Sequence, residues 1–224
     1  MSKAGVFSAI ALCIGVSTHV LADDWPAPQV REVFSANRSY FVRITPGESL
    51  GETWGFAGQK VGKHAQAQFF VEQPDKSYRL QATVDLPNPV APVDFFVSNK
   101  GDLLTVDNWH NRGYGAVLVL VRLDGKLVKA YELADLFTKK EIDSFSQSTS
   151  SILWHKGATF INEEQNIFYM GDSESPDYRE LILKLKDGSV TLCARPLLIQ
   201  QKAPHCWSPP LASMTKRRRE LPDK

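Results

Sequence analysis

The densest group of chemically capable side chains lies in residues 107–115, which read DNWHNRGYG. Asp107 and His110 could work together as an acid and a base, because histidine changes its charge near neutral pH. The same two side chains could instead be two ligands of a metal ion. Trp109 and Tyr114 could stack on a sugar or on another flat ligand. These residue types therefore indicate a binding loop with some catalytic potential.

The same residue types also have structural uses in a loop. Asp and Asn commonly bond to the backbone of their own turn, and Gly113 and Gly115 can supply positive φ. Trp109 could pack across a sheet instead of facing a ligand. We expect no catalytic residue, no cofactor and no metal. The candidate binding loop is defined by five side chains: Asp107, Asn108, Trp109, His110 and Tyr114.

Other candidate sites are weaker. His64, His155 and His205 lack the spacing of a zinc site. We interpret His155, which follows Trp154 in an expected strand, as a half-buried structural residue. Residues 171–178, GDSESPDY, carry alternating carboxylates but not the EF-hand pattern, so we expect a solvated acidic loop.

A second hypothesis is an exported enzyme, either a hydrolase or a lyase acting on glycans. It would use residues 107–115, combining Asp107 and His110 with a carboxylate from residues 172–177, if the fold brings these loops to one end of a sheet. The serines at 148–151 do not stand in a nucleophile elbow. We therefore expect a binding or interaction protein in preference to an enzyme.

The elements that must position this loop are β-strands. Apolar and polar residues alternate in short runs, and Asp-Gly pairs at 124–125 and 187–188 are strong hairpin signals. One helix is expected over residues 134–145, with Thr138 and Glu141 at the spacing of a capping box. The expected strands are 39–44, 68–71, 78–84, 93–97, 103–106, 116–122, 127–133, 151–154, 158–162, 167–170, 180–185 and 189–193.

Two units of about 40 residues, 93–133 and 151–193, resemble one another in their order of strands and turns, although the second has one more strand. Residues 68–86 could be the closing half of an earlier unit. The pattern of 93–133, a strand, xxGxL, a strand, a loop, a strand, DGK and a strand, resembles a blade of the β-propeller families. The segments PVDFFVSNKG and DNWHNRGYG also resemble small exported bacterial proteins of uncharacterised function. Neither resemblance supplies a catalytic residue.

The resemblance implies a mostly β fold, an antiparallel meander that is β-propeller-like or a partial propeller, with one short linker helix. A closed propeller needs at least four blades, and three units at most can be read. An ordinary antiparallel sandwich or barrel remains the alternative.

Residues 1–22 have the organisation of a secretory signal peptide: Lys3, an uncharged apolar run, and Ala22 as a small residue before Asp23. We expect cleavage between Ala22 and Asp23, and a periplasmic or secreted protein. The apolar run is about half of the roughly 20 residues that span a bilayer, so we expect no stable membrane span.

Export also sets the chemistry of the cysteines. Cys13 falls in the expected signal peptide, which leaves Cys193 and Cys206. An oxidising compartment favours one disulfide between them, and two free thiols are the alternative. The bridge would tie the Pro-rich residues 203–210 to the last strand.

We expect one β-rich domain over residues 23–210 and a basic, disordered tail over 211–224. The chain has 26 Lys and Arg against 25 Asp and Glu, and no basic body stands behind the tail, so we expect no nucleic-acid partner. The expected partner is a protein or a glycan. A third hypothesis is assembly into an oligomer through open sheet edges.

Overall fold

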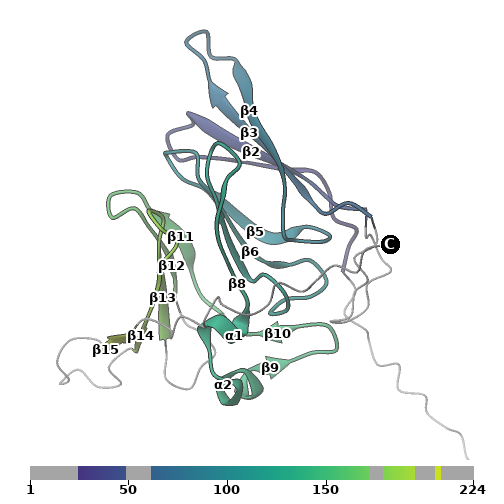
Figure 1. Cartoon of the computed structure of the whole chain (residues 1–224), viewed down its shortest axis with the longest axis vertical. Coiled ribbons are helices and arrows are strands. Elements are labelled where there is room, and N and C mark those ends of the chain that lie inside the picture. The colour runs from purple at the N-terminus through teal and green to yellow at the C-terminus, as the bar shows by residue number, and fades with distance from the viewer. Residues whose placement is uncertain (1–24, 49–61, 172–178, 195–204, 208–224) are drawn as a thin grey trace, which may run out of the picture.

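The computed structural model describes residues 25–48, 62–171, 179–194 and 205–207, and most of its regular secondary structure is β-strand (Figure 1). The expected signal peptide and its cleavage site, the acidic residues 172–177 and the basic tail lie outside the described residues.

Three antiparallel meander sheets make up most of the described chain, and in each of them the strands pair in sequence order. The first sheet contains β1 (Arg31–Phe34), β2 (Tyr40–Thr45), β3 (Gln66–Glu72) and β4 (Tyr78–Asp85). The middle sheet contains β5 (Pro92–Val97), β6 (Leu103–Asn108), β7 (Leu118–Val121) and β8 (Leu127–Tyr131). The third contains β11 (Thr159–Asn162), β12 (Ile167–Met170), β13 (Arg179–Lys184), β14 (Val190–Ala194) and β15 (His205–Trp207).

The middle sheet is buried on both faces because it lies between the other two. Successive side chains of a strand point to opposite faces. On β7, Leu118 and Leu120 belong to the core shared with the third sheet, whereas Val119 and Val121 belong to the core shared with the first. A strand that is apolar at every position is therefore what this place in the fold requires.

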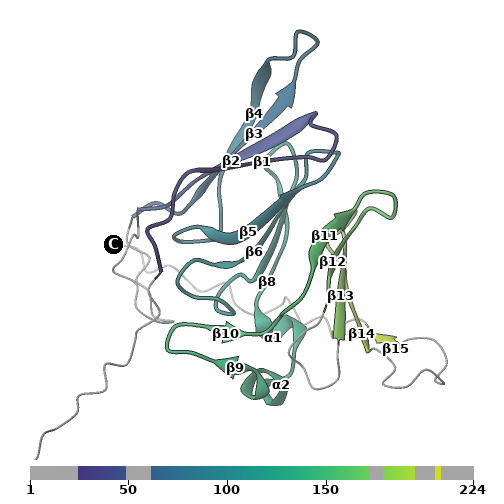
Figure 2. The ribbon, with the colours of Figure 1, turned by 180° about the vertical axis from the view of Figure 1, so that it is seen from behind.

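The three sheets are arranged like successive propeller blades. The first strand of each sheet lies next to that of its neighbour, since β5 contacts both β1 and β11. Figures 1 and 2 show the middle sheet between the other two from opposite sides. The predicted fold class, a mostly β antiparallel meander with blade-like sheets, is confirmed, and 68–86 does close a four-stranded unit begun by β1 and β2.

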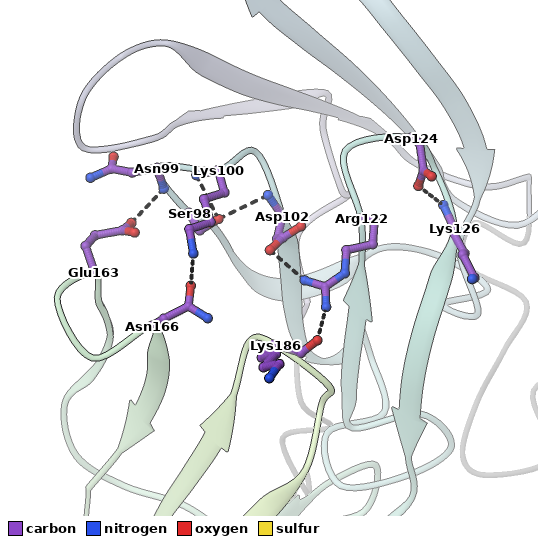
Figure 3. Close-up of polar contacts among 10 residues, drawn as sticks. All are labelled: Ser98, Asn99, Lys100, Asp102, Arg122, Asp124, Lys126, Glu163, Asn166 and Lys186. Carbon is purple, nitrogen blue, oxygen red and sulfur yellow. Dashed lines mark hydrogen bonds and ion pairs between the residues drawn. The ribbon is translucent and has the colours of Figure 1, made fainter.

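Short turns gather at one end of the sheets, called here the turn end, and they bond across the sheets (Figure 3). The backbone N–H of Asn37 donates to Oδ1 of Asn99 over 2.8 Å, and the N–H of Asn99 donates to Oε1 of Glu163 over 2.8 Å. Lys100 Nζ also donates to Oδ1 of Asn166 at 3.2 Å. These bonds join the first turn of all three sheets, and the connection after β6 lies at the opposite end of the middle sheet.

An ion pair between buried Asp102 and partly buried Arg122 adds a further link at the turn end (Figure 3). Arg122 Nη1 lies 2.7 Å from Oδ2 of Asp102, and Arg122 Nη2 donates to the carbonyl of Lys186 on the third sheet. Burial raises the pKa of Asp102, and the positive charge and hydrogen bond of Arg122 oppose that rise.

The expected single helix is wrong in one respect, because the segment forms two short helices, α1 (Leu133–Leu136) and α2 (Lys139–Ser144). Thr138 is the N-cap of α2, and its backbone is extended, with φ −69° and ψ 157°. An N-cap residue has a non-helical backbone, so a helix cannot continue through Thr138. The predicted capping box of Thr138 with Glu141 therefore starts α2 and separates it from α1. A two-stranded sheet of β9 (Ser146–Gln147) and β10 (Ile152–Leu153) follows.

The predicted disulfide is present. Cys193 on β14 and Cys206 on β15 are directly paired across the sheet, with their Cα atoms 4.0 Å apart. The bridge fastens β15 to the third sheet. In the part of the chain that the structure describes, no helix is long and apolar enough to cross a membrane.

Candidate functional site

The candidate binding loop begins with Asp107 and Asn108, the last two residues of β6, at the end opposite to the turn end. Its backbone is unusual, because Asp107, His110, Gly113 and Gly115 all have positive φ. Asp107 has φ +58° and His110 has φ +67°, in the left-handed region that most side chains avoid. The loop therefore turns sharply several times within nine residues.

The Asp107 carboxylate is the anchor of this loop. Its side chain is only 1% exposed, and Oδ1 accepts hydrogen bonds from the N–H of Gly113 at 2.9 Å and from Nε1 of Trp154 at 2.8 Å. Oδ2 lies 3.0 Å from Nε2 of His155, whose side chain is 12% exposed. One buried carboxylate thus holds the loop to the residues that follow β10, and its oxygens face protein donors.

Asn108 closes the loop from inside. Its Nδ2 donates to the carbonyls of Tyr114 at 2.6 Å and Ala116 at 3.1 Å, and its Oδ1 accepts from Nδ2 of buried Asn88 at 2.7 Å. The Tyr114 ring is partly buried against the core beside the third sheet. Asn108 and Tyr114 are therefore placed to support the loop.

The more exposed side of the loop carries Trp109, His110 and Arg112, which we call the aromatic surface. Trp25 lies on it: its ring centroid is 5.2 Å from that of Trp109, edge to face, and 5.8 Å from that of His110, stacked. The Arg112 Cζ atom is 5.9 Å from the Trp25 ring centroid. Trp109 Nε1 also donates to the carbonyl of Pro26 at 3.0 Å.

Two buried polar atoms of this loop have no hydrogen-bond partner among the described residues. They are Oδ1 of Asn111, an acceptor, and Nε of Arg112, a donor. Buried polar groups are normally paired, so unpaired ones are informative about a site.

The structure does not join Asp107 to His110 in the pairing that the sequence suggested. Within the described chain no hydrogen bond links them, and the histidine on the carboxylate is His155. His110 faces Trp25, and burial lowers its pKa, so it is neutral near pH 7. Asp107 and His110 are thus placed for different tasks, anchoring and ring contact.

Sequence reasoning missed Trp25, Asn88 and the Trp154–His155 pair as members of this site. Trp154 is 1% exposed and lies 47 residues after the carboxylate it binds, a separation with no motif. Trp25 did carry a signal, since an aromatic residue followed by prolines is the third residue after the expected cleavage site. Among the described residues, no three His, Cys, Asp or Glu side chains are grouped as a metal site.

Comparison with known proteins adds a distant likeness. No protein-family model matches the chain, and no curated protein matches it significantly. The structure is similar to that of the periplasmic gluconolactonase PpgL of Pseudomonas aeruginosa, with 11% sequence identity and a TM-score of 0.36. The match covers 82% of this chain but 58% of that one, so the chain spans less than two thirds of the solved protein. This likeness assigns no role to any residue.

Proposed function

We propose that this chain is a periplasmic or secreted binding protein that uses residues 107–115 as its recognition surface. The observation that carries the proposal is the division of the loop into two sides. Asp107 and Asn108 are buried and hold the loop to its neighbours, whereas Trp109, His110 and Arg112 are partly exposed. A surface fixed before its ligand arrives loses less conformational entropy on binding.

The side chains of the aromatic surface suit a protein or a glycan ligand. Trp and Arg are among the residue types that contribute most to binding at interfaces. A neutral imidazole and an indole offer flat faces for a sugar ring or for another aromatic group. This mode of binding requires no cofactor.

The extracytoplasmic location is supported by two independent features. Residues 1–22 read as a signal peptide, and Cys193 and Cys206 form a disulfide, a bond that persists in oxidising compartments.

A second candidate is an exported hydrolase or lyase that acts on glycans, and one observation favours it. The Asp107 carboxylate lies 3.0 Å from the ring of His155, which is how a buried acid orients a histidine base. In such an enzyme His155 would carry the proton and Asp107 would orient it. His110 would then contact the ligand.

The test presents the chain from Asp23 onward to an array of oligosaccharides and an array of peptides. Binding to one array by the wild type, and its loss in Trp109→Ala, are expected. Phe160→Ala is the matched control, because Phe160 is an aromatic residue that is 46% exposed on β11, outside the loop. Absence of binding on both arrays, or equal binding by Trp109→Ala, would contradict the proposal. Turnover of a bound glycan that stops in His155→Gln would favour the enzyme.

A further inference from the structure

We infer that the aromatic surface recognises an extended, proline-rich peptide with an aromatic residue, and that the chain's own residues 25–28 occupy it as an internal ligand. This inference rests on the proposed function and narrows its ligand to a class of peptide. It begins from the sequence of the docked segment, Trp25-Pro26-Ala27-Pro28.

The docked segment is stiff before it binds. Proline fixes its own φ, has no N–H to donate, and restricts the residue before it to extended backbone. Pro26 and Pro28 therefore hold Trp25 and Ala27 extended, in a conformation that binds with little loss of entropy and presents free carbonyl oxygens.

The contacts resemble a known mode of peptide recognition, in which an extended proline-rich segment binds against aromatic side chains. Trp109 donates its indole N–H to the Pro26 carbonyl at 3.0 Å, from 83 residues along the chain. The Trp25 ring is stacked on His110, and Arg112 lies over it. The hydrogen bond from Trp109 thus holds the backbone of the segment, and His110 and Arg112 contact its Trp25 side chain.

The segment is attached weakly enough to be exchanged. Residues 25–30 belong to no strand, and in the described part of the chain no backbone–backbone hydrogen bond holds them. Val30, at the end of the segment, is 57% exposed. Its hydrogen bond to the loop comes from the Pro26 carbonyl, and its ring contacts come from Trp25.

The docked arrangement also leaves polar groups of the loop unsatisfied. Arg112 Nε and Asn111 Oδ1 are buried and have no partner in the described chain, although Arg112 is one of the groups around Trp25. A peptide that presents a carbonyl to Arg112 Nε could pair this donor. The internal segment is therefore an imperfect ligand that a partner can replace.

A tethered ligand competes through its high effective concentration, so an external peptide must bind the wild type less tightly than a chain without Trp25. The probe is a fluorescent peptide of residues 23–30, DDWPAPQV, measured by fluorescence anisotropy against the chain from Asp23 onward. We expect Trp25→Ala to bind it at least about tenfold more tightly than wild type. Trp25→Ala/Trp109→Ala should lose binding, and Trp25→Ala/Phe160→Ala should keep it.

The peptide DDAAAAQV is the matched control ligand and should not bind. Equal affinity of wild type and Trp25→Ala, no binding to Trp25→Ala, or equal binding of the control peptide would overturn the inference. If Trp25→Ala does not fold, Pro26→Gly/Pro28→Gly tests the same point by removing the stiffness and keeping the ring. Trp109-dependent binding of a glycan without peptide binding would refute this inference and leave the proposed function standing.

Discussion

Trp154 donates its indole N–H to the Asp107 carboxylate over 2.8 Å, so the loop after β6 and the segment after β10 share one buried charge. Gly113 and His155 contact the same carboxylate. The position of the aromatic surface therefore depends on a residue that lies beneath it.

Asp107→Asn should destabilise the protein by about 3 kcal/mol, because an amide cannot accept all the hydrogen bonds that the carboxylate accepts and would leave a buried donor unpaired. Asn tolerates the positive φ at this position, so the change adds little backbone strain. Urea unfolding gives the free energy. Asp124→Asn is the control. Oδ1 of Asp124 accepts a hydrogen bond from the N–H of Lys126 in an exposed turn, and the amide oxygen of Asn can accept the same bond. This control should lower the free energy of unfolding by less than about 0.5 kcal/mol. Equal losses in the two variants would show that Asp107 is not an anchor.

Docking of Trp25 should weaken as the pH falls below about 6.5, the ordinary pKa of histidine. Burial lowers the pKa of His110 in the folded protein, so the folded state resists protonation that the unfolded state accepts. The contribution of neutral His110 to the free energy of unfolding is full above about pH 6.5. It decreases as the pH falls from there toward the lowered pKa of the folded state. Trp fluorescence and unfolding between pH 8 and pH 5 measure this decline. It should be smaller in His110→Phe, which keeps a ring without a titrating group; an identical pH profile would refute the prediction.

Arg122→Met should cost about 2 kcal/mol at pH 7, because it leaves the Asp102 carboxylate buried without its partner. Burial already raises the pKa of Asp102, and losing Arg122 should raise it further. A raised carboxyl pKa lowers stability at pH values where the group must ionise, so the loss should be smaller near pH 4 than at pH 7.

The control for Arg122→Met is Arg43→Met. Arg43 pairs with Glu32 at 2.6 Å, but the two side chains are 40% and 39% exposed. Exposed pairs contribute roughly 0 to 1 kcal/mol, so this variant should unfold almost like wild type. A loss for Arg122→Met that does not depend on pH would rule out the charge of Asp102 as its cause.

Reduction of the Cys193–Cys206 bond should lower the free energy of unfolding by about 3 kcal/mol, since the bridge closes a short loop in the unfolded chain. Non-reduced mass spectrometry of the exported protein should give the chain from Asp23 with two hydrogens missing. Cys193→Ala/Cys206→Ala should be insensitive to reductant. Two free thiols in the exported protein would contradict the prediction.

The strands were predictable because their patterns are local. The β-branched and aromatic residues of β2 and the Asp-Gly turn after β7 are signals from residues that are neighbours in the chain. The uniformly apolar sequence of β7 agrees with its place in the structure, because both of its faces are covered. The break between α1 and α2 was hidden, since a capping box inside a helix-like segment looks the same whether it starts a helix or interrupts one.

The site was only partly predictable. Trp109 and His110 were chosen as candidates from their type and crowding, and their role in binding stays a prediction. The partner of Asp107 was missed, because His155 is 48 residues away and reaches it through the packing of the segment after β10. Trp25 reaches the loop by a tertiary contact across 84 residues, which no spacing rule describes. Local pattern therefore located the loop, and long-range packing decided which of its side chains are buried.

The bonds that join the three sheets at the turn end have a practical consequence for protein engineering. Asn37, Asn99 and Glu163 tie the sheets together at the end that lies away from residues 109–117. Sequence grafted into residues 109–112 should therefore leave the strand registers unchanged, provided that Asp107, Asn108 and Gly113 are retained, because the N–H of Gly113 donates to the Asp107 carboxylate. The molecule offers a small scaffold in which new specificities can be selected at one end while the other end maintains the fold.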